Sequence, residues 1–173
     1  GLEISAEDIQ KDLDRRKPGQ SKITTPRKEE DKIEILSGVF EGKTTGTPIM
    51  MMAKNKDTRP EDYEKLKDVY RPSHADFTYE KKYGSRNWQG SGRASARETL
   101  ARVAAGAIAK KFLKEKLGIE FLAYVEQVGE IKTEINFIKV TSEQIELNIV
   151  RCPDKKVAER MIKLIEQVGK DGD

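Results

Sequence analysis

The feature that most constrains the fold is an apolar helix candidate in the middle of the chain, "SARETLARVAAGAIAKKFLKEKL", over residues 95–117. Between Leu100 and Ala109 its only charged side chain is Arg102. A helix that is apolar on almost every side is typical of a protein core, and its alanines and glycine allow neighbouring elements to pack closely. We therefore expect this helix to be buried all round and to hold its own first turn in a fixed position.

The start of this helix carries cations where a helix already presents positive charge. Ser95 and Glu98 form the S-x-x-E pattern of a capping box, which predicts a helix start at or near Ser95. Arg97 then lies in the first turn and Arg93 just before it, each opposing the helix dipole at a cost of about 0.3–1 kcal/mol. Together with the preceding "GSG", free backbone amides and two guanidiniums predict a phosphate site. The alternative is that both arginines pair with carboxylates elsewhere in the fold.

The remaining hydrophobic pattern predicts an α+β fold, with helices packed against antiparallel β-sheet. Ser5 is typical of a helix N-cap, and Ile9 and Leu13 give the first helix a narrow apolar stripe. In order, we expect a helix over residues 5–17, a hairpin of strands over 33–42 (with an irregularity at its Ser-Gly) and 46–55, strands within 119–131 and 144–152, and a closing helix over 152–173. We interpret residues 1–173 as one domain or a fragment of one.

In residues 55–92 the apolar residues show neither helical nor strand spacing. We expect these residues to form a functional loop with a short helical piece. A stretch this long without regular structure is uncommon inside a compact domain, and its many aromatic residues argue against simple disorder. The loop contains "RPSHAD", with Arg71 and the only histidine of the chain, His74. Imidazole titrates near neutral pH and can act as a general acid or base. From the residues alone, a lone histidine in a loop is more often an inert surface residue.

Charge and composition argue against several classes of protein. With 33 basic and 30 acidic side chains the net charge is only +3, so no nucleic-acid partner is expected. A single-stranded nucleic-acid-binding module stays the alternative function, because basic and aromatic residues alternate within residues 55–92. No apolar run is long enough for a membrane span or a signal segment. Cys152 is the only cysteine, so we expect neither a disulfide nor a metal site, and a cytoplasmic setting is the default.

Two further basic positions have simple structural explanations. Arg16, in "RRKPG", lies where a cation suits the C-terminus of a helix. Lys22 follows in a polar loop and is explained by solvation alone.

Two long segments, in the same order and spacing, resemble the chorismate synthase family. They are "DLDRRKPGQSKITTPRKEEDKIEILSGVFEGKTTGTPI" and "RPSHADFTYEKKYGSRNWQGSGRASARETLARVAAGAIAKK", the second with the family's R-x-S-A-R-E-T signature. "NKDTRPEDY" and "CPD" fit as well, so the resemblance covers nearly the whole chain. It implies that a family segment with a G-E-S-H-G motif precedes Gly1 and that a second half with more flavin-binding residues follows Asp173.

The resemblance also implies a fold and an activity. The fold would be about half of a β-α-β sandwich, with helices between antiparallel sheets, in a homotetramer. The activity would be that of a shikimate-pathway lyase, which converts 5-enolpyruvylshikimate 3-phosphate to chorismate by eliminating phosphate and a proton. Reduced FMN is required although the reaction has no net redox change. We expect the 173-residue chain alone to be inactive and to bind FMN weakly.

The R-x-S-A-R-E-T signature carries over the residues implied to bind flavin. Arg93, Ala94 and Ser95 would contact FMN, and Ser95, Ala96 and Arg97 would touch the substrate or the flavin. Ala94 replaces a serine that is common in the family, which leaves only its backbone for a flavin contact.

Four further positions match functional positions of the family. Arg71 would bind substrate, and His74 would be the catalytic proton donor near the reduced flavin or the departing phosphate. Arg16 and Lys22 match two basic positions that bind anionic substrate or NADPH. Lys22 stands where an arginine is frequent, and a lysine keeps the charge but loses the bidentate geometry.

Overall fold

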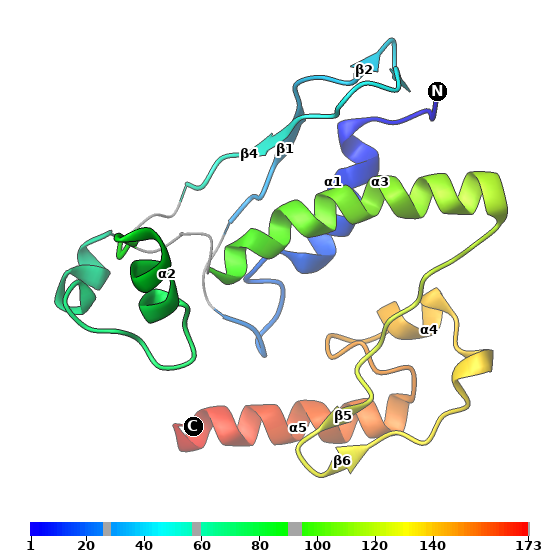
Figure 1. Cartoon of the computed structure of the whole chain (residues 1–173). Helices are drawn as coiled ribbons and strands as arrows, with labels where there is room; N and C mark the ends of the chain where they lie inside the picture. Colours follow the sequence, from blue (N-terminus) through cyan, green and yellow to red (C-terminus); the bar gives the residue numbers. More distant parts are fainter. Residues whose placement is uncertain (26–28, 57–59, 90–94, 173) are drawn as a thin grey trace. The chain divides into compact units, whose positions relative to one another are not determined.

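The computed structural model describes residues 1–25, 29–56, 60–89 and 95–172 (Figure 1). The chain divides into two compact units, the first made of residues 1–18 and 27–118 and the second of residues 19–26 and 119–173. Helices and short antiparallel strands make up the described elements, which confirms the predicted α+β class. No helix within the described ranges is long and apolar enough to cross a membrane.

Helix α1, Ala6–Arg16, begins as the sequence predicts. Ser5 is its N-cap and forms a capping box with Asp8. The Asp8 N–H donates to Ser5 Oγ at 3.3 Å, and the Ser5 N–H donates to the Asp8 carboxylate at 3.0 Å. Ile9 and Leu13, one turn apart, are completely buried. The predicted apolar stripe is therefore the face on which the core of the first unit is built.

Helix α3, Thr99–Leu117, packs against α1, and Figure 1 shows the two helices next to each other. The side chains of α3 that are buried in this core are Leu100, Ala104 and Ala107. The prediction that the helix is buried all round is wrong, because three alanines on another flank are exposed: Ala101, Ala105 and Ala109. The exposure has a geometric cause. Only one face of α3 packs on α1, although its other flanks are also apolar.

The start of α3 differs from the predicted capping box. A 3₁₀ turn, η2 (Ala96–Glu98), precedes the helix, and the Glu98 N–H donates to the Ser95 carbonyl at 3.0 Å. Ser95 Oγ accepts a hydrogen bond from the Arg97 N–H at 3.3 Å instead of from Glu98. Because a 3₁₀ turn is wound more tightly than an α-helical one, the serine meets the amide two residues ahead. Ser95 thus caps the helical segment at the predicted position, with a different partner.

The predicted hairpin is present as the antiparallel pair of β1 (Ile33–Ile35) and β4 (Met51–Ala53). The predicted irregularity also exists, because the chain turns at Gly38 (φ +80°) and forms a separate hairpin from β2 (Val39–Phe40) and β3 (Lys43–Thr44). A Cβ at Gly38 would lie 2.7 Å from the Pro48 carbonyl oxygen, so the close approach requires glycine.

Residues 60–89 contain a 3₁₀ helix, η1 (Pro60–Leu66), and an α-helix, α2 (Asp76–Tyr83). The expected short helical piece is thus confirmed, whereas the functional role of residues 55–92 stays a prediction. Arg86 joins the two pieces, because its Nη2 donates to the backbone carbonyls of Leu66, Lys67 and Val69 and its Nε to Glu80.

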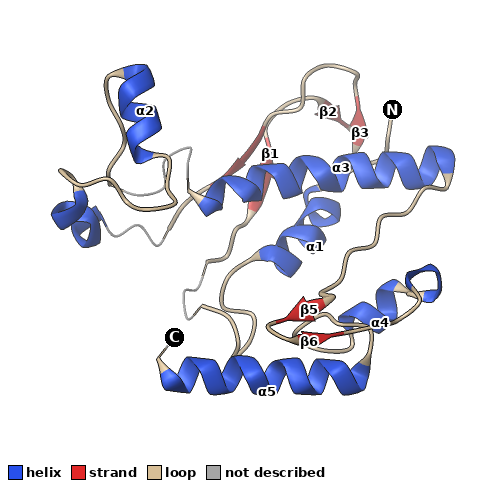
Figure 2. Cartoon of the chain, turned by 60° about the horizontal axis from the view of Figure 1, so that its bottom comes forward, coloured by secondary structure: helices blue, strands red, loops and turns tan. Residues whose placement is uncertain are grey.

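The second unit is built on helix α5, Lys155–Asp171, which confirms the predicted closing helix (Figure 2). Met161 of α5 is completely buried together with Cys152. The hairpin of β5 (Gln127–Val128) and β6 (Ile131–Lys132) packs against α5.

Two strand predictions in this unit need correction. Within 119–131, only the residues of β5 and the first residue of β6 are in strands. The strand predicted over 144–152 is wrong, because residues 142–146 form helix α4 (Ser142–Glu146) after a 3₁₀ turn, η3 (Phe137–Lys139). The cause is a capping box in which Thr141 and Gln144 bond each other's backbone N–H.

Replacing Leu13 by alanine should lower the free energy of unfolding by about 2–5 kcal/mol, because it removes apolar contacts and leaves a cavity in the core. The matched control is Leu36→Ala, since the Leu36 side chain is 48% exposed and its loss should cost about 0.5 kcal/mol or less. Urea denaturation followed by circular dichroism measures both variants. Equal losses of unfolding free energy in the two variants would contradict the role of Leu13 in the core.

Candidate functional site

A buried carboxylate joins the end of α1 to the start of α3. The Asp31 side chain is completely enclosed, and its backbone has a φ of +47°, which is uncommon outside glycine. Arg16 Nη1 lies 3.0 Å from Asp31 Oδ2, and Arg97 Nη1 lies 2.9 Å from Asp31 Oδ1. We call Asp31, Arg16 and Arg97 the Asp31 cluster. It explains how Arg97 is tolerated at the positive end of α3, because a carboxylate lies against its guanidinium.

Both arginines of the Asp31 cluster make further contacts that fix their guanidinium groups. Arg16 donates to the Thr99 hydroxyl from Nε (3.2 Å) and Nη2 (3.1 Å), and to the Ala96 carbonyl from Nη2 (3.2 Å). Arg97 Nη2 donates to the Lys54 carbonyl at 3.2 Å. Each guanidinium therefore has a defined orientation and is about one-fifth exposed.

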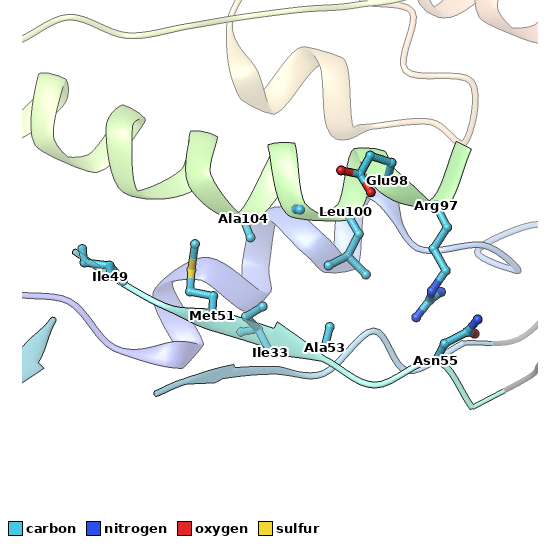
Figure 3. Close-up of a pocket in the computed structure, with 10 residues that line it drawn as sticks. Ile33, Ile49, Met51, Ala53, Asn55, Arg97, Glu98, Leu100 and Ala104 are labelled. Carbon is cyan, nitrogen blue, oxygen red and sulfur yellow. The ribbon is translucent and has the colours of Figure 1, made fainter. Parts of the chain in front are cut away.

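A pocket of about 450 Å³ lies between the β1–β4 pair and the start of α3. Most of its lining residues are of apolar type and come from both elements, including Ile33, Met51, Ala53, Leu100 and Ala104. Its polar lining residues are Asn55, Arg97 and Glu98. Figure 3 shows the Arg97 side chain extending toward Asn55. A pocket of this size with apolar walls and a few polar groups is typical of small-molecule sites.

A second buried carboxylate, Asp76, binds the arginine and the histidine of "RPSHAD". Arg71 donates to both carboxylate oxygens, from Nε to Oδ2 at 2.8 Å and from Nη2 to Oδ1 at 2.9 Å. His74 Nδ1 lies 2.8 Å from Asp76 Oδ1. The Asp76 side chain is only 3% exposed, so these bonds replace the water that it loses on burial. We call Arg71, His74 and Asp76 the Asp76 cluster.

The surroundings of Asp76 favour its ionised form. The Arg71 guanidinium, hydrogen-bonded to the carboxylate, holds the pKa of Asp76 far below its usual range, against the opposing effect of burial. The Arg71 backbone N–H adds a bond of 3.1 Å to Oδ2, and Arg86 Nη1 lies 3.5 Å from the same oxygen. The Tyr63 ring lies under the Arg71 guanidinium, 5.6 Å from ring centre to Cζ.

The structure brings the predicted residues together in two groups. Arg16, Ala96 and Arg97 meet in the Asp31 cluster, next to Ser95, and Arg71 and His74 meet in the Asp76 cluster. Lys22 belongs to the second unit, where it pairs with Glu166. Arg93 and Ala94 lie outside the described residues.

For Arg97, the alternative interpretation from the sequence is confirmed, because its guanidinium pairs with carboxylates, Asp31 at 2.9 Å and Glu29 at 3.6 Å. This pairing does not remove the side chain from the pocket, which Arg97 also lines. For His74, the interpretation as an inert surface residue is too simple, because three-quarters of its side chain is covered and its Nδ1 is bonded.

Sequence reasoning missed both carboxylates. Asp76 could have been found, since it lies two residues after His74 and directly precedes a possible helix. Asp31 gave no signal, because it lies in the charged run "RKEEDK", a composition that is typical of a solvated segment.

Comparison with known proteins shows to which family this chain belongs. The family model for chorismate synthase matches residues 1–173. The chain belongs to the chorismate synthase family. Proteins named chorismate synthase from Nostoc punctiforme and from Synechocystis are 62% identical over 172 residues and 64% identical over 167 residues. These alignments cover 99% and 96% of the chain but 48% and 46% of the relatives, so the chain spans about half the length of the curated relatives it matches.

Replacing Asp31 by asparagine should lower the free energy of unfolding by about 3–5 kcal/mol, because two guanidiniums would lose the carboxylate that compensates them. The control is the neighbouring Glu30→Gln, whose exposed pair with Lys56 should contribute less than about 1 kcal/mol. Urea denaturation at neutral pH measures the difference. An Asp31→Asn variant as stable as Glu30→Gln would show that the buried pairs contribute nothing.

Asp76 should also give a specific dependence of stability on pH. Its pKa is lowered on folding, so its ionised form stabilises the folded state above the pKa of an unfolded aspartate, about 3.9, and this contribution is lost as the pH falls further. The stability difference between the unchanged chain and Asp76→Asn should therefore shrink below about pH 4. Unfolding followed by the fluorescence of the single tryptophan, Trp88, tests this. A difference that grows on acidification would contradict it.

Proposed function

We propose that the longer polypeptide corresponding to this chain is a chorismate synthase. It would convert 5-enolpyruvylshikimate 3-phosphate to chorismate by eliminating phosphate and a proton. The proposal is carried by the family match over all 173 residues. It is supported by the Asp76 cluster, which holds an arginine and the only histidine of the chain on one carboxylate.

The proposed roles follow from the chemistry of the substrate, an anion with carboxylate and phosphate groups. Guanidiniums bind such groups in a defined geometry, and we assign substrate contacts to Arg71, Arg97 and Arg16, with Ser95 and Ala96 beside them. A departing phosphate gains charge, so fixed cations near it lower the barrier to its loss. His74 is assigned the transfer of a proton, for which imidazole is suited near neutral pH.

The pocket beside Arg97 has features that suit a flavin with a phosphate. Its apolar side chains can contact a flat ring, and its volume of about 450 Å³ lies in the range of small-molecule sites. We assign FMN contacts to Arg93, Ala94 and Ser95, which directly precede Ala96 in the sequence. When bound, reduced FMN would supply an electron transiently and recover it. The chain itself would bind the flavin, orient it and exclude water.

Further assignments extend to positions that the two clusters do not include. Lys22, together with Arg16, is proposed to contact anionic substrate or NADPH, and the lysine would have to exchange its pairing with Glu166 for that contact. The longer protein is proposed to be a cytoplasmic homotetramer. The 173-residue chain alone is proposed to be inactive and to bind FMN weakly.

An anaerobic assay with reduced FMN tests this function. We expect a polypeptide extended to the full length of its relatives to form chorismate and phosphate in equal amounts, and the 173-residue chain to form neither. In the extended protein, His74→Ala should lower kcat by about 10²–10⁴-fold, the usual contribution of a general acid or base. The control Glu115→Gln, at the far end of α3, should leave kcat unchanged.

A binding titration separates the proposal from a nucleic-acid-binding module. FMN with substrate, and a random single-stranded oligonucleotide, are titrated against the extended protein at physiological salt. Saturable binding of FMN and substrate supports the lyase. Tighter, saturable binding of the oligonucleotide, with no chorismate formed, would overturn it.

A further inference from the structure

The Asp76 cluster determines which nitrogen of His74 carries a fixed proton. We propose that Asp76 is a positioning residue, which holds His74 as the Nδ1–H tautomer and leaves Nε2 as the nitrogen that gains and loses a proton. The catalytic meaning of this arrangement rests on the proposed function. The tautomer itself does not, because it follows from contacts within the chain.

Two distances to one carboxylate oxygen carry the assignment. His74 Nδ1 lies 2.8 Å and Arg71 Nη2 lies 2.9 Å from Asp76 Oδ1, and the two nitrogens lie 3.1 Å apart. A guanidinium can only donate, and an ionised carboxylate can only accept. If Nδ1 carried no proton, it could accept the longer bond from Arg71 Nη2 at 3.1 Å, but its lone pair would also face the nearer carboxylate oxygen at 2.8 Å. A proton on Nδ1 removes that repulsion and gives Oδ1 two donors.

Among the described residues, the cations in contact with Asp76 favour its ionised form. Arg71 and Arg86 are both cations near Oδ2, and the Arg71 backbone N–H donates to the same oxygen. Glu80 of α2 is the nearby acid, and it accepts a hydrogen bond from Arg86 Nε at 3.1 Å. Asp76 is therefore an acceptor with no proton of its own to offer His74.

The backbone of "RPSHAD" is folded to place these side chains on one carboxylate. The His74 N–H donates to the Arg71 carbonyl at 3.3 Å, and Ser73 has a φ of +56°. Proline at the second position and a positive φ at the third are the pattern of a type II turn, which normally favours glycine at the third. Asp76 then opens α2. A serine in this strained conformation indicates that the surrounding contacts maintain it.

A carboxylate bonded to one ring nitrogen fixes both the tautomer and the ring orientation of a histidine. About a quarter of the His74 side chain is exposed, and the bond from Nδ1 to Asp76 leaves Nε2 as the other ring nitrogen. The proton that His74 exchanges is thus assigned to Nε2. Asp76 would act through His74 without touching the reacting atoms.

The single histidine makes the tautomer directly measurable. The 173-residue chain is labelled with ¹⁵N-histidine, and long-range proton–nitrogen NMR spectra are recorded above the pH at which the ring is protonated. We expect one set of imidazole signals with a protonated Nδ1 and an unprotonated Nε2. A protonated Nε2, or the averaged signals of a free imidazole, would overturn the proposal.

Variants test whether Asp76 is the cause. Asp76→Asn should lose the uniform Nδ1–H pattern, and Asp76→Glu, which keeps a carboxylate, should restore it in part. The control Glu80→Gln removes another carboxylate of α2 and should keep the pattern. If Asp76→Asn retains the pattern while folded, Asp76 is not the positioning residue. If this variant does not fold, the spectrum of the unchanged chain still decides the tautomer.

In the extended protein, Asp76→Asn should lower kcat by about tenfold to a hundredfold, as loss of a partner that orients a functional histidine typically does. His74 is assigned as a proton donor and must be protonated to act, so the basic limb of the kcat profile reports it. This limb should shift in Asp76→Asn and be unchanged in Glu80→Gln. A purely structural loss would lower the amount of active enzyme without moving the limb, and that result would overturn the positioning role. An Nδ1–H tautomer in a protein that forms no chorismate would overturn the proposed function and leave the assignment of the ring proton in place.

Discussion

The burial of two carboxylates constrains the first unit more than any other interaction. An ionised aspartate cannot leave water unless cations and hydrogen-bond donors replace its hydration. Asp31 obtains them from Arg16 at the end of α1 and Arg97 before α3, so two helix ends must meet at one point. Asp76 obtains them from Arg71 and His74 on the turn just before its own helix. The positions of the basic side chains that bind these two aspartates are therefore fixed by the buried carboxylates.

The fold could be predicted where local chemistry agrees with the tertiary structure. The Ser5–Asp8 capping box, the stripe of Ile9 and Leu13 and the closing helix α5 follow from spacing and capping alone. The wrong predictions arise where two sequence patterns favour different structures. Residues 144–152 are rich in apolar residues and resemble a strand, but the Thr141 capping box starts a helix there. The burial of α3 was overestimated because composition indicates which faces are apolar and not which of them are covered.

For the site, the sequence indicated the cations and missed the anions. Arg97 stands out because it opposes a helix dipole, and His74 because it is the only histidine of the chain. Arg16 and Arg71 became functional candidates through the family resemblance. An aspartate in a charged run is expected to be solvated, and only tertiary contacts reveal that Asp31 is enclosed. The pairing changes the interpretation of the arginines. Each is a structural cation and, in the proposed function, a candidate ligand for an anion, and the carboxylate that fixes it also competes with that ligand.

The exposed flank of α3 has a consequence for the stability of the helix itself. Ala101, Ala105 and Ala109 present only methyl groups to water, so this flank exposes little apolar area for each residue. Alanine also has the highest intrinsic helix propensity, since it loses no side-chain rotamer entropy when it becomes helical. Helix α3 can therefore leave this flank in water at little cost, while its opposite face packs on α1. Arg97 lies in the 3₁₀ turn directly before α3. The high helix propensity of the alanines in α3 therefore helps to hold Arg97 in place.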